Sequence, residues 1–175
     1  HGIVLKLINN FIAQAIATAT AEALAAAAKS GLSIAKLHQV ISAGAVNSGI
    51  FQMMVGKMLE GHGDLTGLKF TLVNAMKDLR YYTHFAESLP VSAIVGEAVH
   101  QSLVNANLMG FGDKYVASLI EAQEKLNGVR IVPRRAHARH PGPLPASGER
   151  EHTQERRQRH SLAPRSGERV GVRGA

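Results

Sequence analysis

Residues 3–29 read IVLKLINNFIAQAIATATAEALAAAAK, and this stretch decides the fold. It is rich in Ala, Leu and Ile and contains no Gly or Pro, so it predicts one long helix. Lys29 suits the last helical turn, and Gly31 fits the position where a helix ends in the left-handed region. Because the helix is apolar around most of its circumference, we expect other helices to surround it.

The next 100 residues contain further helical segments separated by turn signals. We expect helices at about 34–43, 47–58, 67–87, 91–109 and 114–126, with Ser33 as an N-cap and Asn127-Gly128 as the last helix end. No segment alternates with period two, and no hairpin turn separates strand-like runs. Residues 1–132 are therefore predicted to form an all-α helical bundle of about six helices with a long central helix.

Residues 133–175 differ in composition from the rest of the chain. They contain ten arginines and four glutamates, so this segment carries +6 of the formal net charge of +7. They are rich in Pro, Gly, Ser and His and poor in apolar residues, which predicts a disordered tail. The composition resembles read-through of a GC-rich repeat. The alternative is a basic arm that binds nucleic acid, but this partner is not expected because the tail lacks aromatic residues for base stacking.

Several functional classes find no support in the sequence. The chain has no cysteine, and its histidines lack ligand spacing, so neither a disulfide framework nor a metal site is expected. Polar residues from Gln14 to Glu22 interrupt the apolar run, so we expect no membrane span and a cytoplasmic location. There is no Gly-x-Gly-x-x-Gly motif and no hydrolase elbow. Because the first residue is His1, we interpret the chain as a processed product or a fragment.

Two clusters of polar residues are candidates for a functional site. Lys6, Asn10 and Gln14 follow one another at a spacing of four, so they share one face of the long helix. The helix dipole and the apolar neighbours are both expected to make the charged form of Lys6 less favourable, so that its amine can gain and lose a proton near neutral pH as a general acid–base does. Asn10 could orient a substrate through its amide. The alternative is a snorkelling lysine beside capping amides. Lys77 and Asp78, taken alone, are typical of a solvated charge pair on a helix.

These motifs together resemble the C-terminal domain of the β-hydroxyacid dehydrogenase family. The matching residues are Lys6-Leu7-Ile8-Asn9-Asn10, Lys77-Asp78-Leu79 at the expected distance, and Gly110-Phe111-Gly112-Asp113. The family includes 3-hydroxyisobutyrate dehydrogenase and tartronate semialdehyde reductase and is related to 6-phosphogluconate dehydrogenase. The resemblance covers residues 1–131.

The resemblance implies an oxidoreductase that transfers a hydride between NAD or NADP and a small 3-hydroxyacid. It makes Lys6 the catalytic acid–base, Asn10 a substrate-binding residue, and Lys77 and Asp78 cofactor-binding residues. It also implies a homodimer formed through the helical domain. The family's N-terminal Rossmann domain, which holds most of the cofactor, is absent from this sequence, so we expect the chain alone to be inactive.

Two departures from the family pattern leave alternatives open. Tyr81-Tyr82 stands where small residues are common, and residues 86–91 lack the usual glycine, so the substrate is expected to differ from the familiar small acids. A non-catalytic helical dimerisation module, or a pseudogene remnant, is the alternative function. Imine reductases share the architecture but usually replace the lysine that matches Lys6.

Overall fold

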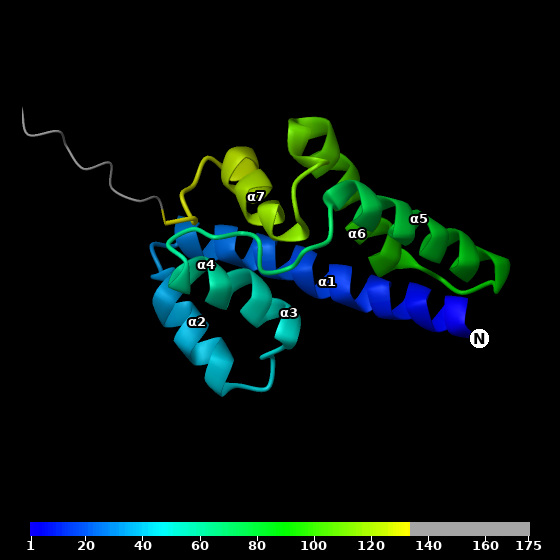
Figure 1. Ribbon diagram of the computed structural model, residues 1–175, viewed down its shortest axis with the longest axis horizontal. Coiled ribbons are helices and arrows are strands. Elements are labelled where there is room, and N and C mark those ends of the chain that lie inside the picture. Colours follow the sequence, from blue (N-terminus) through cyan, green and yellow to red (C-terminus); the bar gives the residue numbers. More distant parts are fainter. Residues whose placement is uncertain (134–175) are drawn as a thin grey trace, which may run out of the picture. The chain divides into compact units, whose positions relative to one another are not determined.

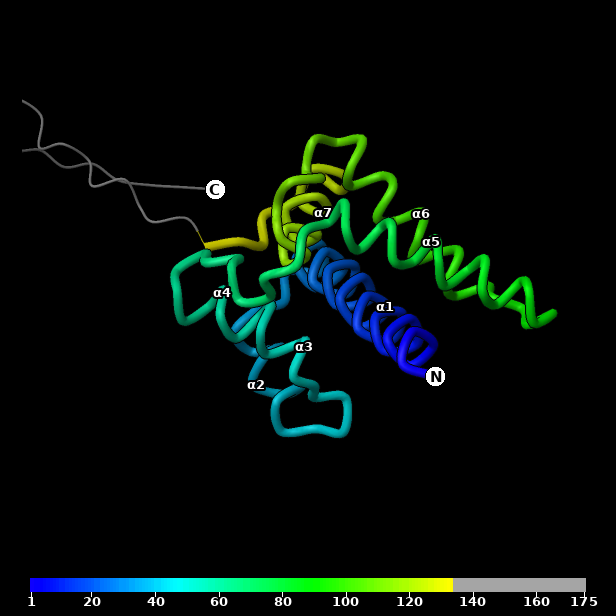
Figure 2. The backbone as a smooth tube through the Cα atoms, turned by 45° about the vertical axis from the view of Figure 1, so that its right-hand side comes forward, coloured from blue at the N-terminus to red at the C-terminus, as the bar shows by residue number. Residues whose placement is uncertain are grey.

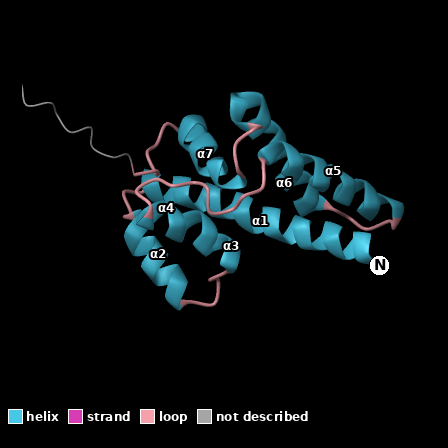
Figure 3. Cartoon of the chain, viewed as in Figure 1, coloured by secondary structure: helices cyan, strands magenta, loops and turns pink. Residues whose placement is uncertain are grey.

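The computed structural model describes residues 1–133, and in this part of the chain the fold is all-α, as the sequence predicts (Figures 1 and 3). Helix α3 (Gly49–Phe51), a π-helical turn (Gln52–Gly56) and helix α4 (Lys57–Glu60) follow one another without a break and form one continuous helical segment. Counted in this way, the described residues contain six helical segments. A second π-helical turn, Asn107–Phe111, extends one helix, and a 3₁₀ turn, Val116–Ser118, precedes another. The helices are α1 (Gly2–Lys29), α2 (Ile34–Ala43), α3 (Gly49–Phe51), α4 (Lys57–Glu60), α5 (Leu72–Ser88), α6 (Ile94–Ala106) and α7 (Leu119–Asn127).

Helix α1 is the centre of the bundle. It packs against α5, α6 and α7 on one side and against α2 and α3 on another, and Figure 2 shows it between these two groups. Small buried residues, Ala17, Ala21 and Ala25, let the neighbouring helices approach closely, and Leu24 fills the space between them. The surrounding core consists of large side chains from the other helices, among them Met54, Met58, Leu72, Leu79, Leu103 and Ile120.

Helix α1 is also long and apolar enough to cross a membrane, by length and composition alone. Its most apolar 18-residue window has a mean hydropathy of 1.4, and 39% of that window is buried among the other helices. The core helix of a helical bundle meets the same criterion. Packing against the other helices accounts for the buried part of this composition.

The predicted helix ends are confirmed where local capping chemistry determines them. The Ser33 side chain accepts a hydrogen bond from the Lys36 backbone N–H at 3.4 Å, and the Ser48 side chain accepts one from Phe51 N–H at 3.1 Å. Gly31 and Gly128 follow α1 and α7 with φ of +78° and +61°, the left-handed conformation that glycine adopts without strain.

The prediction that a helix begins at residue 67 is wrong, because α5 begins at Leu72. The backbone around Thr71 pairs instead with the segment before α7: Leu72 N–H donates to Lys114 C=O at 2.9 Å, and Val116 N–H donates to Phe70 C=O at 2.8 Å. Long-range pairing therefore replaces the first helical turn. The helices expected from residues 91 and 114 also begin later, at Ile94 and Leu119.

The predicted disordered tail falls almost entirely on residues 134–175, which lie outside the described residues. The expectation of a domain boundary near residue 132 stays a prediction for the same reason.

Candidate functional site

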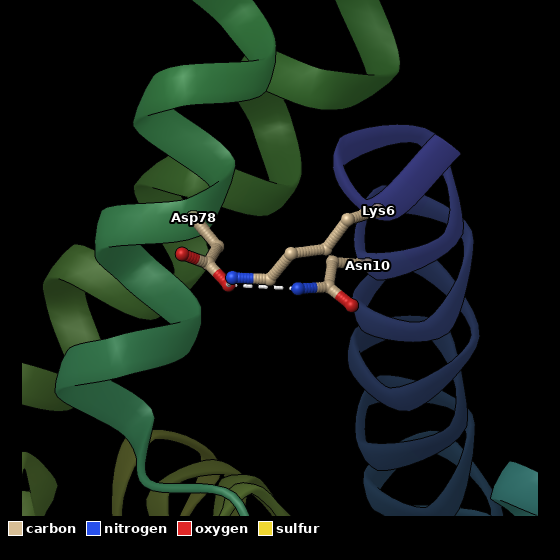
Figure 4. Close-up of polar contacts among 3 residues, drawn as sticks. All are labelled: Lys6, Asn10 and Asp78. Carbon is tan, nitrogen blue, oxygen red and sulfur yellow. Dashed lines mark hydrogen bonds and ion pairs between the residues drawn. The ribbon is translucent and has the colours of Figure 1, made fainter. Parts of the chain in front are cut away.

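Three predicted site residues meet between α1 and α5, which run antiparallel beside each other (Figures 1 and 2). The Asn10 side-chain amide donates a hydrogen bond from Nδ2 to Asp78 Oδ2 at 2.7 Å. The Lys6 ammonium lies 3.7 Å from the same oxygen. Figure 4 shows both side chains reaching from α1 toward the carboxylate on α5. Residues 68 positions apart thus form one polar cluster, which we call the Lys6–Asn10–Asp78 site.

Helical periodicity places Asp78 on the inner face of α5. The buried residues of this helix recur at spacings of three and four, and Asp78 belongs to this stripe with an exposed fraction of 4%. A buried carboxylate is costly unless hydrogen-bond donors compensate the lost hydration. Asn10 and Lys6 supply such donors, so the interpretation of Asp78 as part of a solvated charge pair is wrong.

The Lys6 side chain is 66% exposed, in contrast to the buried environment that its apolar neighbours suggested. Those neighbours are themselves exposed: Ile3 has an exposed fraction of 78% and Leu5 of 67%. The expectation that apolar surroundings disfavour the ammonium is therefore wrong for this part of the chain. The nearest charge to the Lys6 ammonium is the Asp78 carboxylate, 3.7 Å away.

Lys77 lies apart from the Lys6–Asn10–Asp78 site. It is exposed on α5, one residue before Asp78 and so about 100° around the helix axis. Within residues 1–133, no hydrogen bond or ion pair joins the Lys77 ammonium to another side chain. Its amine is available to a group that approaches from outside.

The polar stripe of α1 continues inward beyond Asn10. Gln14 and Thr18 follow at the same spacing of four and are buried, with exposed fractions of 2% and 8%. Gln14 Oε1 and Thr18 Oγ1 have no hydrogen-bond partner among the described residues. The sequence indicated Gln14 as part of the stripe, whereas Thr18 was noted only as an interruption of the apolar run.

An aromatic pair that sequence reasoning missed adjoins the site. The rings of Phe11 and Tyr82 are stacked, with centroids 4.1 Å apart and planes 7° from parallel. Phe11 follows Asn10, and Tyr82 lies one helical turn after Asp78. The only sequence signal was the unusual Tyr81-Tyr82 pair, and nothing in the sequence indicated that Phe11 would pair with either ring.

The described residues offer no metal centre: within residues 1–133 no three His, Asp or Glu side chains are grouped closely enough to hold an ion. The chemistry available to the site is that of an ammonium, an amide and a carboxylate. Together they can bind an oxygen-bearing substrate and exchange one proton with it.

Comparisons with known proteins identify the family to which this all-α fold belongs. Residues 1–122 match the family described as "NAD-binding of NADP-dependent 3-hydroxyisobutyrate dehydrogenase". The chain belongs to this family. The sequence-based recognition of the hydroxyacid dehydrogenases is thereby confirmed at the level of the family.

Two curated relatives come from Arabidopsis thaliana. Glyoxylate/succinic semialdehyde reductase 1 is 30% identical over 122 residues, which cover 70% of this chain and 41% of the relative. Glyoxylate/succinic semialdehyde reductase 2, chloroplastic, is 27% identical over 122 residues, covering 70% of this chain and 33% of the relative. The chain thus spans less than half the length of either relative.

A solved structure shares the fold. The 3-hydroxyisobutyrate dehydrogenase from Salmonella typhimurium superposes with a TM-score of 0.60 at 22% sequence identity, over 67% of this chain and 40% of that one. At this level of identity the likeness concerns the fold alone.

The family model is described as NAD-binding. Among the described residues, the exposed Lys77 ammonium has the charge that suits a phosphate. The sequence has no Gly-x-Gly-x-x-Gly turn, the usual cradle for the pyrophosphate at a helix N-terminus.

Proposed function

We propose that this chain is the C-terminal, substrate-handling domain of an NAD(P)-dependent dehydrogenase that interconverts a small 3-hydroxyacid and its semialdehyde. The observation that carries the proposal is the convergence of Lys6 and Asn10 on the buried Asp78 carboxylate, at 3.7 and 2.7 Å. Support for the C-terminal placement comes from the resemblance of residues 1–131 to that domain. The Rossmann half would correspond to the length of the relatives that this chain does not cover.

Lys6 transfers the proton in this proposal. In the direction of reduction, the Lys6 ammonium donates a proton from Nζ to the carbonyl oxygen while a hydride adds to the carbonyl carbon, and the product is the alcohol. In the reverse direction the neutral amine accepts the hydroxyl proton. The nicotinamide, when bound, supplies or accepts the hydride.

Asn10 and Asp78 position the reacting groups. The Asp78 carboxylate holds the Asn10 amide through Nδ2, which leaves the amide oxygen of Asn10 free to accept a hydrogen bond from a substrate hydroxyl. The same carboxylate draws the flexible, mostly exposed lysine to one side of α5. Such positioning lowers the entropic cost of bringing the proton donor to the substrate. Lys77 would contact the cofactor from the adjacent face of α5.

The semialdehyde substrate class is supported by the two Arabidopsis relatives, whose names describe reductases of glyoxylate and succinic semialdehyde. Both compounds carry a carboxylate and an aldehyde. The Lys6–Asn10–Asp78 site offers one cation and one amide for such oxygens, which accords with a small, oxygen-rich substrate.

The test requires a complete enzyme, so the chain is co-expressed with the Rossmann domain of a family member, and nicotinamide absorbance is followed with 3-oxopropanoate, the semialdehyde of 3-hydroxypropanoate. We expect Lys6→Met to lower kcat by about 10²–10⁴-fold, the usual contribution of a general acid. Lys29→Met, at the exposed end of α1, is the matched control and should leave kcat unchanged. Added ethylamine should partly rescue a Lys6→Ala variant, because the shortened side chain leaves room for the free amine. Full activity in Lys6→Met would refute the proposed role.

We further propose that the domain forms a homodimer through the outer face of α1. Leu5, Ile8 and Ile12 are 67%, 40% and 51% exposed and lie within about 60° of one another around the helix axis, which is unusual for large apolar residues. Sedimentation velocity should show a dimer that Ile12→Glu dissociates, with Lys29→Glu as the control. A dimer that supports no turnover in the complete enzyme would favour the non-catalytic module instead. A cytoplasmic location stays a prediction.

A further inference from the structure

The stacked Phe11 and Tyr82 rings have no role in proton transfer, yet they lie directly beside the groups that carry it. Phe11 follows Asn10 on α1, and Tyr82 lies four residues after Asp78 on α5, so their side chains neighbour the Asn10–Asp78 hydrogen bond. Both residues are only half-buried, which leaves part of the pair accessible. The site is therefore polar on one side and aromatic on the other.

The antiparallel register of α1 and α5 brings Tyr82 level with Lys6. Asn10 contacts Asp78, so one turn earlier on α1 and one turn later on α5 the opposing residues are Lys6 and Tyr82. The Lys6 side chain reaches across from α1 to the Asp78 carboxylate, as Figure 4 shows. A substrate whose oxygen meets the Lys6 ammonium thus has the tyrosine ring on its flank.

The Tyr82 ring is held on two sides and has little freedom to swing away. Phe11 covers one face at 4.1 Å. Gly96, buried in α6, borders the ring so closely that a Cβ there would lie 2.9 Å from Tyr82 Cε1 and 3.2 Å from Cδ1. The backbone of α6 therefore supports the ring edge and blocks its movement toward that helix.

From this geometry we infer that Tyr82, clamped between Phe11 and Gly96, is the specificity-determining residue of the site. It forms a fixed wall that restricts the substrate to 3-hydroxyacids with a short chain on the carbon that bears the hydroxyl. The inference rests on the proposed function, because it assumes that Lys6 meets the reacting oxygen. Its chemistry is steric: the ring occupies the volume that a longer alkyl substituent would need.

The test compares 3-hydroxypropanoate, 3-hydroxybutanoate and 3-hydroxyhexanoate as substrates of the complete enzyme. We expect Tyr82→Ala to raise the ratio of kcat/KM for hexanoate over propanoate by about tenfold or more, as is usual when a pocket gains room for extra methylenes. Tyr82→Phe should keep the wild-type ratio, because the ring and not the hydroxyl forms the wall. Tyr81→Ala, which removes the exposed neighbouring ring, is the matched control and should also keep it.

A second variant covers the case in which Tyr82→Ala does not fold. Tyr82→Leu keeps an apolar side chain against Phe11 and Gly96 and should raise the same ratio by a smaller factor. An unchanged ratio in the folded Tyr82 variants, with turnover still dependent on Lys6, would overturn the wall and leave the proposed function standing. Absence of any Lys6-dependent turnover of 3-hydroxyacids in the wild-type enzyme would overturn both.

Discussion

The two contacts of the Asp78 carboxylate should differ in strength, and double-mutant cycles on the isolated chain can measure the difference. One cycle combines Asn10→Ala with Asp78→Ala, and the other combines Lys6→Ala with Asp78→Ala. In each cycle the cost of the cavity left by Asp78 cancels, so the remainder is the coupling between the two side chains.

The structure sets the expected magnitudes. The Asn10–Asp78 bond is short, 2.7 Å, and its acceptor is a buried carboxyl oxygen, so we expect a coupling of about 1.5–3 kcal/mol. The Lys6–Asp78 pair is longer, 3.7 Å, and its lysine is 66% exposed to screening by water and salt. We expect that coupling to stay below about 1 kcal/mol.

The assay is urea unfolding followed by circular dichroism at 222 nm, at low and high salt, for wild type, single and double variants. The Lys6–Asp78 coupling should shrink at high salt and the Asn10–Asp78 coupling should not. A lysine coupling equal to or larger than the asparagine coupling would refute the reasoning, because it would mean that the ion pair is shielded from solvent.

Two further predictions concern the bundle itself. Burial lowers the pKa of His100 from its ordinary value of 6.5, with Glu97 opposing the shift and Arg80 and His84 adding to it. The unfolded chain therefore binds the proton more readily, so the free energy of unfolding should be complete above about pH 6.5 and should decrease as the pH falls toward the lowered pKa. His100→Gln should flatten this slope in urea titrations at several pH values; an unchanged slope would contradict it. Separately, Gly67→Ala should destabilise the fold by about 1–3 kcal/mol, since the new Cβ would lie 2.0 Å from the Met53 carbonyl oxygen, whereas Gly49→Ala meets no atom within 4 Å and is the control. Equal thermal midpoints for these two variants would contradict the prediction, because they would show that the segment around Gly67 moves without cost to make room for the new Cβ.

Much of the fold follows from local features of the sequence. The Ala-rich run predicts α1 because its propensity is uniform over 28 residues, and serines and glycines mark helix ends through hydrogen bonds and backbone conformations that involve only near neighbours. The spacing of Lys6 and Asn10 likewise places both on one face without knowledge of any other helix. Their resemblance to a known motif identified the family.

Only the tertiary structure decided which surfaces of these helices meet. Asp78 looks solvated in sequence, and it is buried because α5 packs its stripe against α1, where the amide of Asn10 compensates the carboxylate. Phe11 and Tyr82 are 71 positions apart, and no local pattern pairs them. Helix α5 starts at Leu72 because residues 70–73 hydrogen-bond to residues 112–116. Local propensity acts over a few residues, whereas burial and long-range pairing depend on the whole bundle, so the sequence alone determined the helices and the packing determined the site.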